Sequence, residues 1–237
     1  MSEQRTRYAM VIDLYRCVGC GACEIACKTH NEVPAGSFLS YHINDTTGVF
    51  PDVEYSYRPV MCNHCTKAAC VKACPTAAMH KDEFGITVHE PSKCVACGLC
   101  AAACPYGAIT RVDGKSSAQQ VGAVDALIEG CTGSGKELQV LVGAGYPSHD
   151  PILDDYSLPN TKPGGPLKCQ LCKHLVYSGD NPYCVDSCPA GARVFGNIED
   201  IYGEVYELTP SYEAEVLKPS EGTEPAVYYI RQFEKTW

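Results

Sequence analysis

Apolar residues are gathered in short stretches, with polar and turn-forming segments between them. Residues 11–15, 86–89, 193–195 and 227–230 are rich in β-branched or aromatic side chains, and each stretch has the length of a strand. Nowhere does an apolar stretch approach the length of a membrane span. Residues 227–230 are either a strand of the chain's own sheet or part of an aromatic tail that docks on a partner. The pattern predicts an α+β fold built from small elements.

Two longer segments separate these stretches. Residues 30–61 are rich in turn formers and predict a long surface loop or a hairpin. Residues 112–165 form a second insertion, in which 121–129 follow a helical pattern and 138–142 a strand pattern. A loop rich in glycine, proline and aspartate completes it. We therefore expect loop or hairpin insertions between the parts of the framework.

The 17 cysteines change this picture, because they follow a recognisable spacing. Residues 94–105 read Cys-Val-Ala-Cys-Gly-Leu-Cys-Ala-Ala-Ala-Cys-Pro, with three cysteines at every third position and a fourth before a proline. This is the spacing of bacterial ferredoxins, whose loop directs thiolates to the iron corners of a 4Fe-4S cluster. Gly98 gives the loop its backbone freedom. The fourth cysteine normally reaches a second cluster, so the spacing predicts a pair.

The same arrangement occurs in four sets, which makes it an internal repeat. Arg16, before the first set, corresponds to Lys93, before the third. Three sets end in Cys-Pro, whereas Lys28 follows Cys27, so we expect the chain to leave the first set differently. Cys131 belongs to no set. The sets are Cys17, Cys20, Cys23 and Cys27; Cys62, Cys65, Cys70 and Cys74; Cys94, Cys97, Cys100 and Cys104; and Cys169, Cys172, Cys184 and Cys188.

The crossover of the fourth cysteine assigns ligands to each cluster. The second and third sets are expected to exchange their last cysteines, and so are the first and last. The predicted fold is therefore α+β with two ferredoxin-like units of two 4Fe-4S clusters each: a continuous inner unit at 54–111, and an outer unit formed from both chain ends, 1–53 and 166–200. Residues 201–237 are expected to be a partner-docking tail. The predicted ligand sets are Cys17, Cys20, Cys23 and Cys188; Cys62, Cys65, Cys70 and Cys104; Cys94, Cys97, Cys100 and Cys74; and Cys169, Cys172, Cys184 and Cys27.

Composition and charge exclude several functions. The 237 residues have a formal net charge of -9, and each four-thiolate cluster would add about two negative charges, which excludes nucleic acid as a partner. An odd number of closely spaced cysteines excludes a disulfide framework. Residues 1–8 contain neither a twin-arginine pair nor an apolar signal segment, so we expect no export signal of the chain's own.

Zinc is the structural alternative to iron, because Cys-x-x-Cys pairs are its usual ligands. The fourth set, with its longer gap before Cys184, would by itself pass for a zinc site. In the other sets, three cysteines at every third position (first and third sets) and a closing Cys-Pro (second and third sets) favour iron and sulfide.

Other residues carry weaker signals. Residues 130–136 have the spacing of a phosphate-binding loop, but Glu137 stands where a Ser or Thr would bind magnesium, so an ordinary loop is predicted. Cys131 is expected to be a buried small residue rather than a ligand or a reactive thiol. His64 and His174 are expected to form hydrogen bonds near a cluster rather than to bind iron. No catalytic residue is predicted. Five lysines flank the cysteines and either raise cluster potentials or are solvated surface charges: Lys28, Lys67, Lys72, Lys93 and Lys173.

The order and spacing of the four sets resemble the iron–sulfur subunit of the dimethyl-sulfoxide-reductase superfamily of molybdopterin oxidoreductases, over nearly the whole chain. The resemblance to the small subunit of respiratory arsenate reductase is strongest around residues 48–53 (Gly-Val-Phe-Pro-Asp-Val), 62–65, 71–76 and 126–132. The tail at 215–229 is also similar to the small subunit of pyrogallol–phloroglucinol transhydroxylase. Catechol dehydroxylases and the polysulfide, thiosulfate and tetrathionate reductases are further relatives in this resemblance.

This resemblance implies an electron-transfer subunit of anaerobic respiration that makes and breaks no substrate bonds. Four 4Fe-4S clusters would relay single electrons to or from a large catalytic subunit, which carries molybdopterin guanine dinucleotide with Mo or W. A membrane quinol-oxidising subunit or a soluble carrier would be the other partner. Co-export with a twin-arginine partner favours an extracytoplasmic location, with the cytoplasm as the alternative. From another class, a stand-alone polyferredoxin is the rival interpretation.

Overall fold

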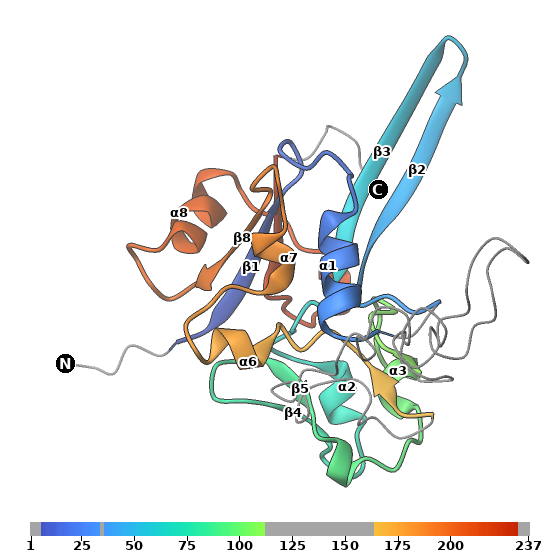
Figure 1. The fold of residues 1–237 in the computed structure, drawn as a ribbon, viewed down its shortest axis with the longest axis vertical. Coiled ribbons are helices and arrows are strands. Elements are labelled where there is room, and N and C mark those ends of the chain that lie inside the picture. Colours follow the sequence, from blue (N-terminus) through green and yellow to red (C-terminus); the bar gives the residue numbers. More distant parts are fainter. Residues whose placement is uncertain (1–5, 34–35, 112–163, 232–237) are drawn as a thin grey trace, which may run out of the picture.

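The structure is a computed structural model that describes residues 6–33, 36–111 and 164–231. Figure 1 shows these residues as a small central sheet, a cysteine-rich part with short helices, and a projecting hairpin. The helix predicted at 121–129, the strand predicted at 138–142, the loop 130–136 and Cys131 lie outside the described residues.

The central sheet joins the two ends of the chain. Its middle strand, β1 (Tyr8–Asp13), pairs antiparallel with β8 (Arg193–Asn197) and parallel with β9 (Val227–Ile230). Thus the strands predicted at 11–15, 193–195 and 227–230 are all found, the first displaced toward the N-terminus. The aromatic stretch at 227–230 is a strand of the chain's own sheet and is largely buried.

Both faces of β1 are covered, which explains why its residues do not alternate between apolar and polar. Ala9 and Val11 pack against Val205 of α8 (Glu204–Ser211). Met10 and Ile12 face the other way and belong to the main core, which also contains Cys23, Cys27, Cys62, Cys169 and Cys184. One face of the sheet therefore forms a wall of the cysteine-rich part.

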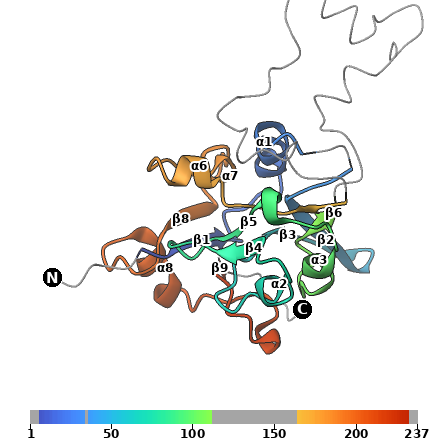
Figure 2. The same cartoon turned by 90° about the horizontal axis from the view of Figure 1, so that it is seen from below.

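A short helix carries or follows the cysteines of each set. Gly21 and Gly98 precede the helices of the first and third sets with φ of 75° and 78°, a left-handed conformation that favours glycine. Figures 1 and 2 show α1 and α7 side by side although they come from opposite ends of the chain. The helices are α1 (Ala22–His30), α2 (Ala69–Lys72), α3 (Leu99–Ala102), α6 (Lys173–Val176) and α7 (Tyr183–Asp186).

Short strand pairs connect the sets. The strand predicted at 86–89 is found as β5 (Thr87–His89). β6 (Thr110–Arg111), before the second insertion, pairs with β7 (Pro166–Leu167), after it. None of the helices in the described ranges is both long enough and apolar enough to span a membrane. The remaining elements are β4 (Met79–Lys81) and the 3-10 turns Pro91–Lys93 and Pro219–Glu221.

The first insertion is a hairpin rather than a loop. β2 (Ser40–Val49) pairs along its whole length with β3 (Asp52–Met61), and the hairpin projects from the rest of the molecule (Figure 1). Its base is buried, whereas Val49 and Phe50 at the tip are 82% and 88% exposed. The expected division between residues 53 and 54 falls inside β3.

Gly48→Ala is expected to disorder the tip of this hairpin. Gly48 has a φ of 87°, and a Cβ there would lie 2.0 Å from the backbone oxygen of Asp52, so the side chain adds a steric clash to a conformational cost of about 1–2 kcal/mol. Limited proteolysis should cleave the variant faster within residues 46–54, with the remainder of the chain protected. Gly179→Ala is the control, since its φ is 90° but a Cβ there meets nothing within 4 Å. Equal cleavage of the wild type and Gly48→Ala would contradict the expectation.

Candidate iron–sulfur cluster sites

Group A, defined as Cys17, Cys20, Cys23 and Cys188, lines one cavity. The first three cysteines come from the loop after β1 and from α1, and Cys188 comes from the loop before β8. Because β1 and β8 are paired, cysteines about 170 positions apart meet here. His42 and Arg193 line the same cavity.

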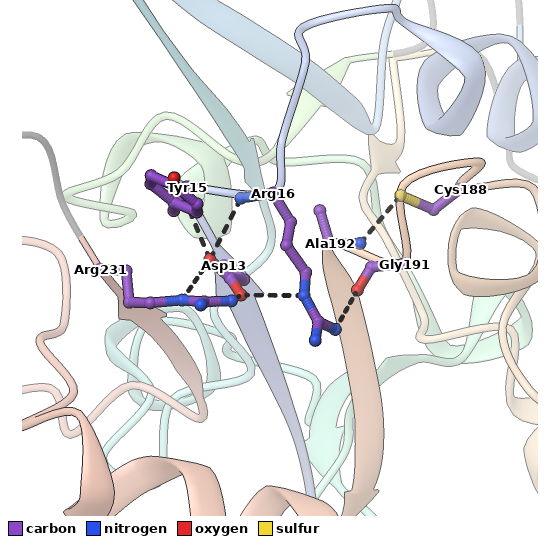
Figure 3. Close-up of polar contacts among 7 residues, drawn as sticks. All are labelled: Asp13, Tyr15, Arg16, Cys188, Gly191, Ala192 and Arg231. Atoms are coloured by element: carbon purple, nitrogen blue, oxygen red, sulfur yellow. Dashed lines mark hydrogen bonds and ion pairs between the residues drawn. The ribbon is translucent and has the colours of Figure 1, made fainter.

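A buried carboxylate holds the loop of group A in place (Figure 3). Asp13 Oδ1 accepts hydrogen bonds from the backbone N–H groups of Tyr15 (3.1 Å) and Arg16 (3.2 Å) and from Arg231 Nε (3.0 Å). The Arg16 guanidinium lies 3.6 Å from Asp13 Oδ2 and 3.5 Å from the carbonyl oxygen of Gly191. The side chains of Asp13 and Arg16 together thus join the end of β1, the segment after Cys188 and the residue after β9.

Group B, defined as Cys27, Cys169, Cys172 and Cys184, lines a second cavity together with Asn31 and Lys168. The chain leaves this group without a Cys-Pro step, because α1 continues through Cys27. Asn31 Nδ2 donates to the carbonyl oxygen (3.0 Å) and to Sγ (3.6 Å) of Cys27. The expectation of a different exit from the first set is confirmed.

Group D, defined as Cys74, Cys94, Cys97 and Cys100, lines a third cavity, formed between α3, the segment after α2 and Pro166. Group C is defined as Cys62, Cys65, Cys70 and Cys104, of which Cys62 and Cys70 are buried. Cys65, Cys70 and Cys104 belong to one small core, and burial, followed by the charge of Cys62, raises the pKa of Cys70 to about 12. The structure therefore brings groups A, B and D together at one cavity each, and in group C the charge of Cys62 acts on Cys65 and Cys70.

The backbone provides hydrogen bonds to the sulfur atoms. One N–H group donates to a cysteine Sγ in each of four loops, always at 3.3 Å: Met79 to Cys74, Ala96 to Cys94, Leu171 to Cys169 and Ala192 to Cys188. Hydrogen bonds of this kind stabilise negative charge on sulfur and tune iron–sulfur clusters. At Cys74, burial acts to raise the pKa, but the N–H groups of Met79 and Thr76 outweigh it and the pKa is lowered.

Two buried cations lie among these cysteines. Arg193 is 3% exposed and donates to Ser40 Oγ (2.9 Å) and Met61 Sδ (3.4 Å). Lys168 is 2% exposed and donates to the carbonyl oxygens of Thr87 and Cys169. No carboxylate in the described part of the chain forms an ion pair with either residue. Sequence reasoning missed both.

The two histidines expected to lie near clusters have different surroundings. His64 is buried, and its Nδ1 accepts a hydrogen bond from the N–H of Thr87 (3.2 Å). Burial, followed by Lys168 and Lys81, lowers its pKa well below the ordinary value, so His64 is neutral. His174 packs against Tyr183, with ring centroids 5.8 Å apart.

Three of the five flanking lysines are exposed, whereas Lys28 and Lys173 are half-buried. Lys67 pairs with Glu224 at 2.6 Å and its side chain is 59% exposed, while Lys72 and Lys93 are exposed. Lys28 donates to the carbonyl oxygen of Ser37 (2.8 Å). Of the two interpretations given for these lysines, surface charge suits Lys67, Lys72 and Lys93.

The donor set suits 4Fe-4S clusters. Thiolates surround each cavity, backbone N–H groups face several of them, and uncompensated buried cations lie close by, as anionic clusters require. Among the described residues, no three His, Cys, Asp or Glu side chains are close enough together to hold a single metal ion. A cluster distributes its four thiolates over four iron corners, so its ligands are spread more widely.

Comparisons with known proteins agree with this chemistry. A family model for a 4Fe-4S dicluster domain matches residues 53–132, and one for a 4Fe-4S binding domain matches residues 8–29. The iron–sulfur subunit ArrB of arsenate respiratory reductase from Shewanella sp. strain ANA-3 is 41% identical over 96% of this chain and 97% of its own length. The B subunit of selenate reductase from Mesobacillus selenatarsenatis is 32% identical over 94% of this chain and 72% of its own. The B subunit of tetrathionate reductase from Salmonella typhimurium is 30% identical over 95% and 73%.

These observations define an iron–sulfur protein with ferredoxin-like 4Fe-4S domains that transfers electrons and is not itself a catalytic subunit. The chain belongs to the family of iron–sulfur subunits of the molybdopterin oxidoreductases, in which the pterin is carried by the partner subunit. The resemblance expected from the cysteine spacing is thereby confirmed.

Asp13→Ala is expected to lower the free energy of unfolding by about 2 kcal/mol, because it leaves Arg231 and two loop N–H groups without their acceptor. The change should appear as a lower midpoint of thermal unfolding and as faster release of iron from the loop of group A. Asp45→Ala is the control, since Asp45 lies on the exposed part of β2. Identical melting of the two variants would show that the Asp13 network does not stabilise the loop.

Proposed function

We propose that this chain holds four 4Fe-4S clusters through groups A to D and relays single electrons to or from a large molybdopterin catalytic subunit. The observation that carries the proposal is the cavity of group A, where Cys188 joins Cys17, Cys20 and Cys23 from the other end of the chain. A bound cluster accepts and releases one electron at a time. The chain's own part is to fix the positions of the clusters, shield them from water and direct N–H groups and charges at their sulfur atoms.

Electrostatic contacts between the groups support a linear order, A–B–C–D. Burial raises the pKa of Cys184 of group B; Arg193 opposes this, and Cys23 of group A adds to it. Burial likewise raises the pKa of Cys169 of group B, and Cys62 of group C adds to it.

Groups C and D lie together in one small core, which contains Cys70 of the former and Cys100 of the latter. The exposed cysteines of the described chain are Cys20 in group A and Cys97 in group D. We infer that electrons enter at one of these ends and leave at the other.

The same contacts support two ferredoxin-like units. The pairing of β1 with β8 and the contact of α1 with α7 favour an outer unit formed from 1–53 and 166–200. The shared core of groups C and D favours an inner unit at 54–111. In this division the β2–β3 hairpin belongs to both units.

Exposed apolar side chains beside the two terminal groups support partner docking at both ends. Val18 (61% exposed) and Ile25 (62%) flank Cys20, and Val95 (62%) and Leu99 (50%) flank Cys97. The likeness to ArrB along 96% of the chain favours an arsenate-reductase-like complex. Because substrate binds on the partner, the selenate and tetrathionate reductase subunits keep those substrate classes as alternatives, and a membrane quinol-oxidising subunit or a soluble carrier would be the second partner.

Single cysteine variants test the grouping. The chain, purified without oxygen, is expected to contain about 16 iron and about 16 sulfide. Cys23→Ser and Cys188→Ser should remove the same EPR signal after dithionite reduction, and Cys27→Ser and Cys184→Ser should remove a different one. Cys184 and Cys188 are close in sequence, so loss of one common signal from both variants would contradict the crossover. Near-stoichiometric zinc with little iron would support the zinc alternative.

Association with the large subunit separates the respiratory subunit from a stand-alone polyferredoxin. Size-exclusion chromatography of the chain co-expressed with its partner should give a heteromer, because apolar side chains surround both terminal groups. If group A faces the catalytic subunit, Val18→Asp combined with Ile25→Asp should weaken the affinity of the two subunits at least tenfold. If group D faces it, Val95→Asp combined with Leu99→Asp should do so. A chain that stays monomeric beside its partner, with all clusters loaded, would favour the polyferredoxin.

A further inference from the structure

The fourth cysteine set buries a basic residue at two positions of the internal repeat. Five residues after the last cysteine stand Met79 in the second set and Ile109 in the third, both buried, whereas the fourth set has Arg193, which is equally buried. The residue before the first cysteine is Arg16, Met61, Lys93 or Lys168, and of the three basic residues only Lys168 is buried. The fourth set thus buries charge at positions where the second and third sets hold apolar or exposed side chains.

A buried charge without an opposite charge is costly, so each cation requires an anion nearby. Arg193 donates hydrogen bonds to the neutral atoms Ser40 Oγ and Met61 Sδ, and Lys168 donates to two backbone carbonyls. The carboxylates of the described chain do not pair with either one. The anions within reach are the cysteine groups.

Each cation faces two groups, not one. Arg193 lines the cavity of group A, and its charge also reaches Cys184 and Cys27 of group B. Lys168 lines the cavity of group B, and its Nζ donates to the carbonyl of Thr87, whose N–H donates to His64, the residue between Cys62 and Cys65 of group C. Burial opposes the charged state of Arg193, but Cys184 and Cys23 raise its pKa above the ordinary value.

We propose that Arg193 and Lys168 are shared counter-ions of the relay, Arg193 between groups A and B and Lys168 between groups B and C. This inference rests on the proposed function. When one electron moves from one group to the next, no bond forms or breaks, and the negative charge shifts from one side of the cation to the other. The cation therefore favours reduction on both sides and lowers the cost of placing charge on neighbouring groups.

The test measures potentials in the complex with the large subunit, purified without oxygen and titrated while EPR signals are followed. Arg193→Met, which restores the repeat residue, is expected to lower the equilibrium constant for one-electron reduction at least tenfold at groups A and B and to leave group D unchanged; each tenfold step corresponds to 59 mV. Lys168→Met should do the same at groups B and C and leave group A unchanged. The cysteine variants assign the signals.

Three further variants separate charge from shape. Lys93→Met removes an exposed cation at the position equivalent to Lys168. It should change the equilibrium constant for one-electron reduction of group D less than threefold, because water and salt screen the charge. Arg193→Lys and Lys168→Arg retain the charge, so their equilibrium constants for one-electron reduction should stay within threefold of those of the wild type. If Arg193→Met fails to load clusters, iron and sulfide in Arg193→Lys decide the question: loading with the charge restored supports the proposal, and equal failure overturns it.

The proposed function and the counter-ion role fail in different ways. Wild-type protein without iron–sulfur signals would overturn the proposed function. Wild-type signals that are present but do not shift in Arg193→Met and Lys168→Met, or that shift equally at all four groups, would overturn only the shared counter-ion role.

Discussion

The pairing of β1 with β8 is the contact on which the arrangement of the cysteines depends. A cluster needs thiolates from four directions, and a single tight loop supplies only three of them before the chain must leave. The fourth has to come from another segment. Here that segment lies at the other end of the chain for the outer groups, and the register of β1 against β8 places the loop after Asp13 beside the segment between Cys188 and Arg193. Asp13 stabilises this junction, because it accepts hydrogen bonds from the loop and forms an ion pair with Arg231.

Charge is the second constraint. The proposed four clusters, with sixteen thiolates, would concentrate negative charge in a small interior, in a chain whose formal charge is already negative. Surface lysines offset little of it, because solvent screens them. Compensation has to come from within, through N–H groups directed at sulfur and through buried Arg193 and Lys168. A buried cation without an anion is costly, so in this proposal cluster insertion stabilises the folded chain.

The sequence predicts much of this arrangement, because clusters impose fixed spacings. The repeat of four cysteine sets and the altered exit after Cys27 follow from local patterns, and of the two alternatives for 30–61, a loop or a hairpin, the structure has a hairpin at 40–61. A strand of the chain's own sheet at 227–230 was one of two alternatives, and its parallel pairing with β1 was not predicted, since pairing over more than 200 positions leaves no local signal. Arg193 was missed because basic residues are usually solvated. The repeat did contain the sign, an arginine aligned with Met79 and Ile109, but only burial shows that this charge is inside.

The cysteines and buried charges lie inside the chain, whereas the surfaces proposed for partner docking lie at its exposed ends. This separation explains how such subunits can serve complexes with different substrates. The spacing of the cysteines and the charges between them are set inside the chain and are independent of what the partner reduces. In the proposed complex the partner contacts the exposed ends, where Cys20 and Cys97 lie beside apolar side chains. A change of substrate therefore requires changes in the partner and in these exposed ends, while Asp13, Arg193 and Lys168 remain under the same physical demand. Relatives with different substrates can thus share one electron-transfer core.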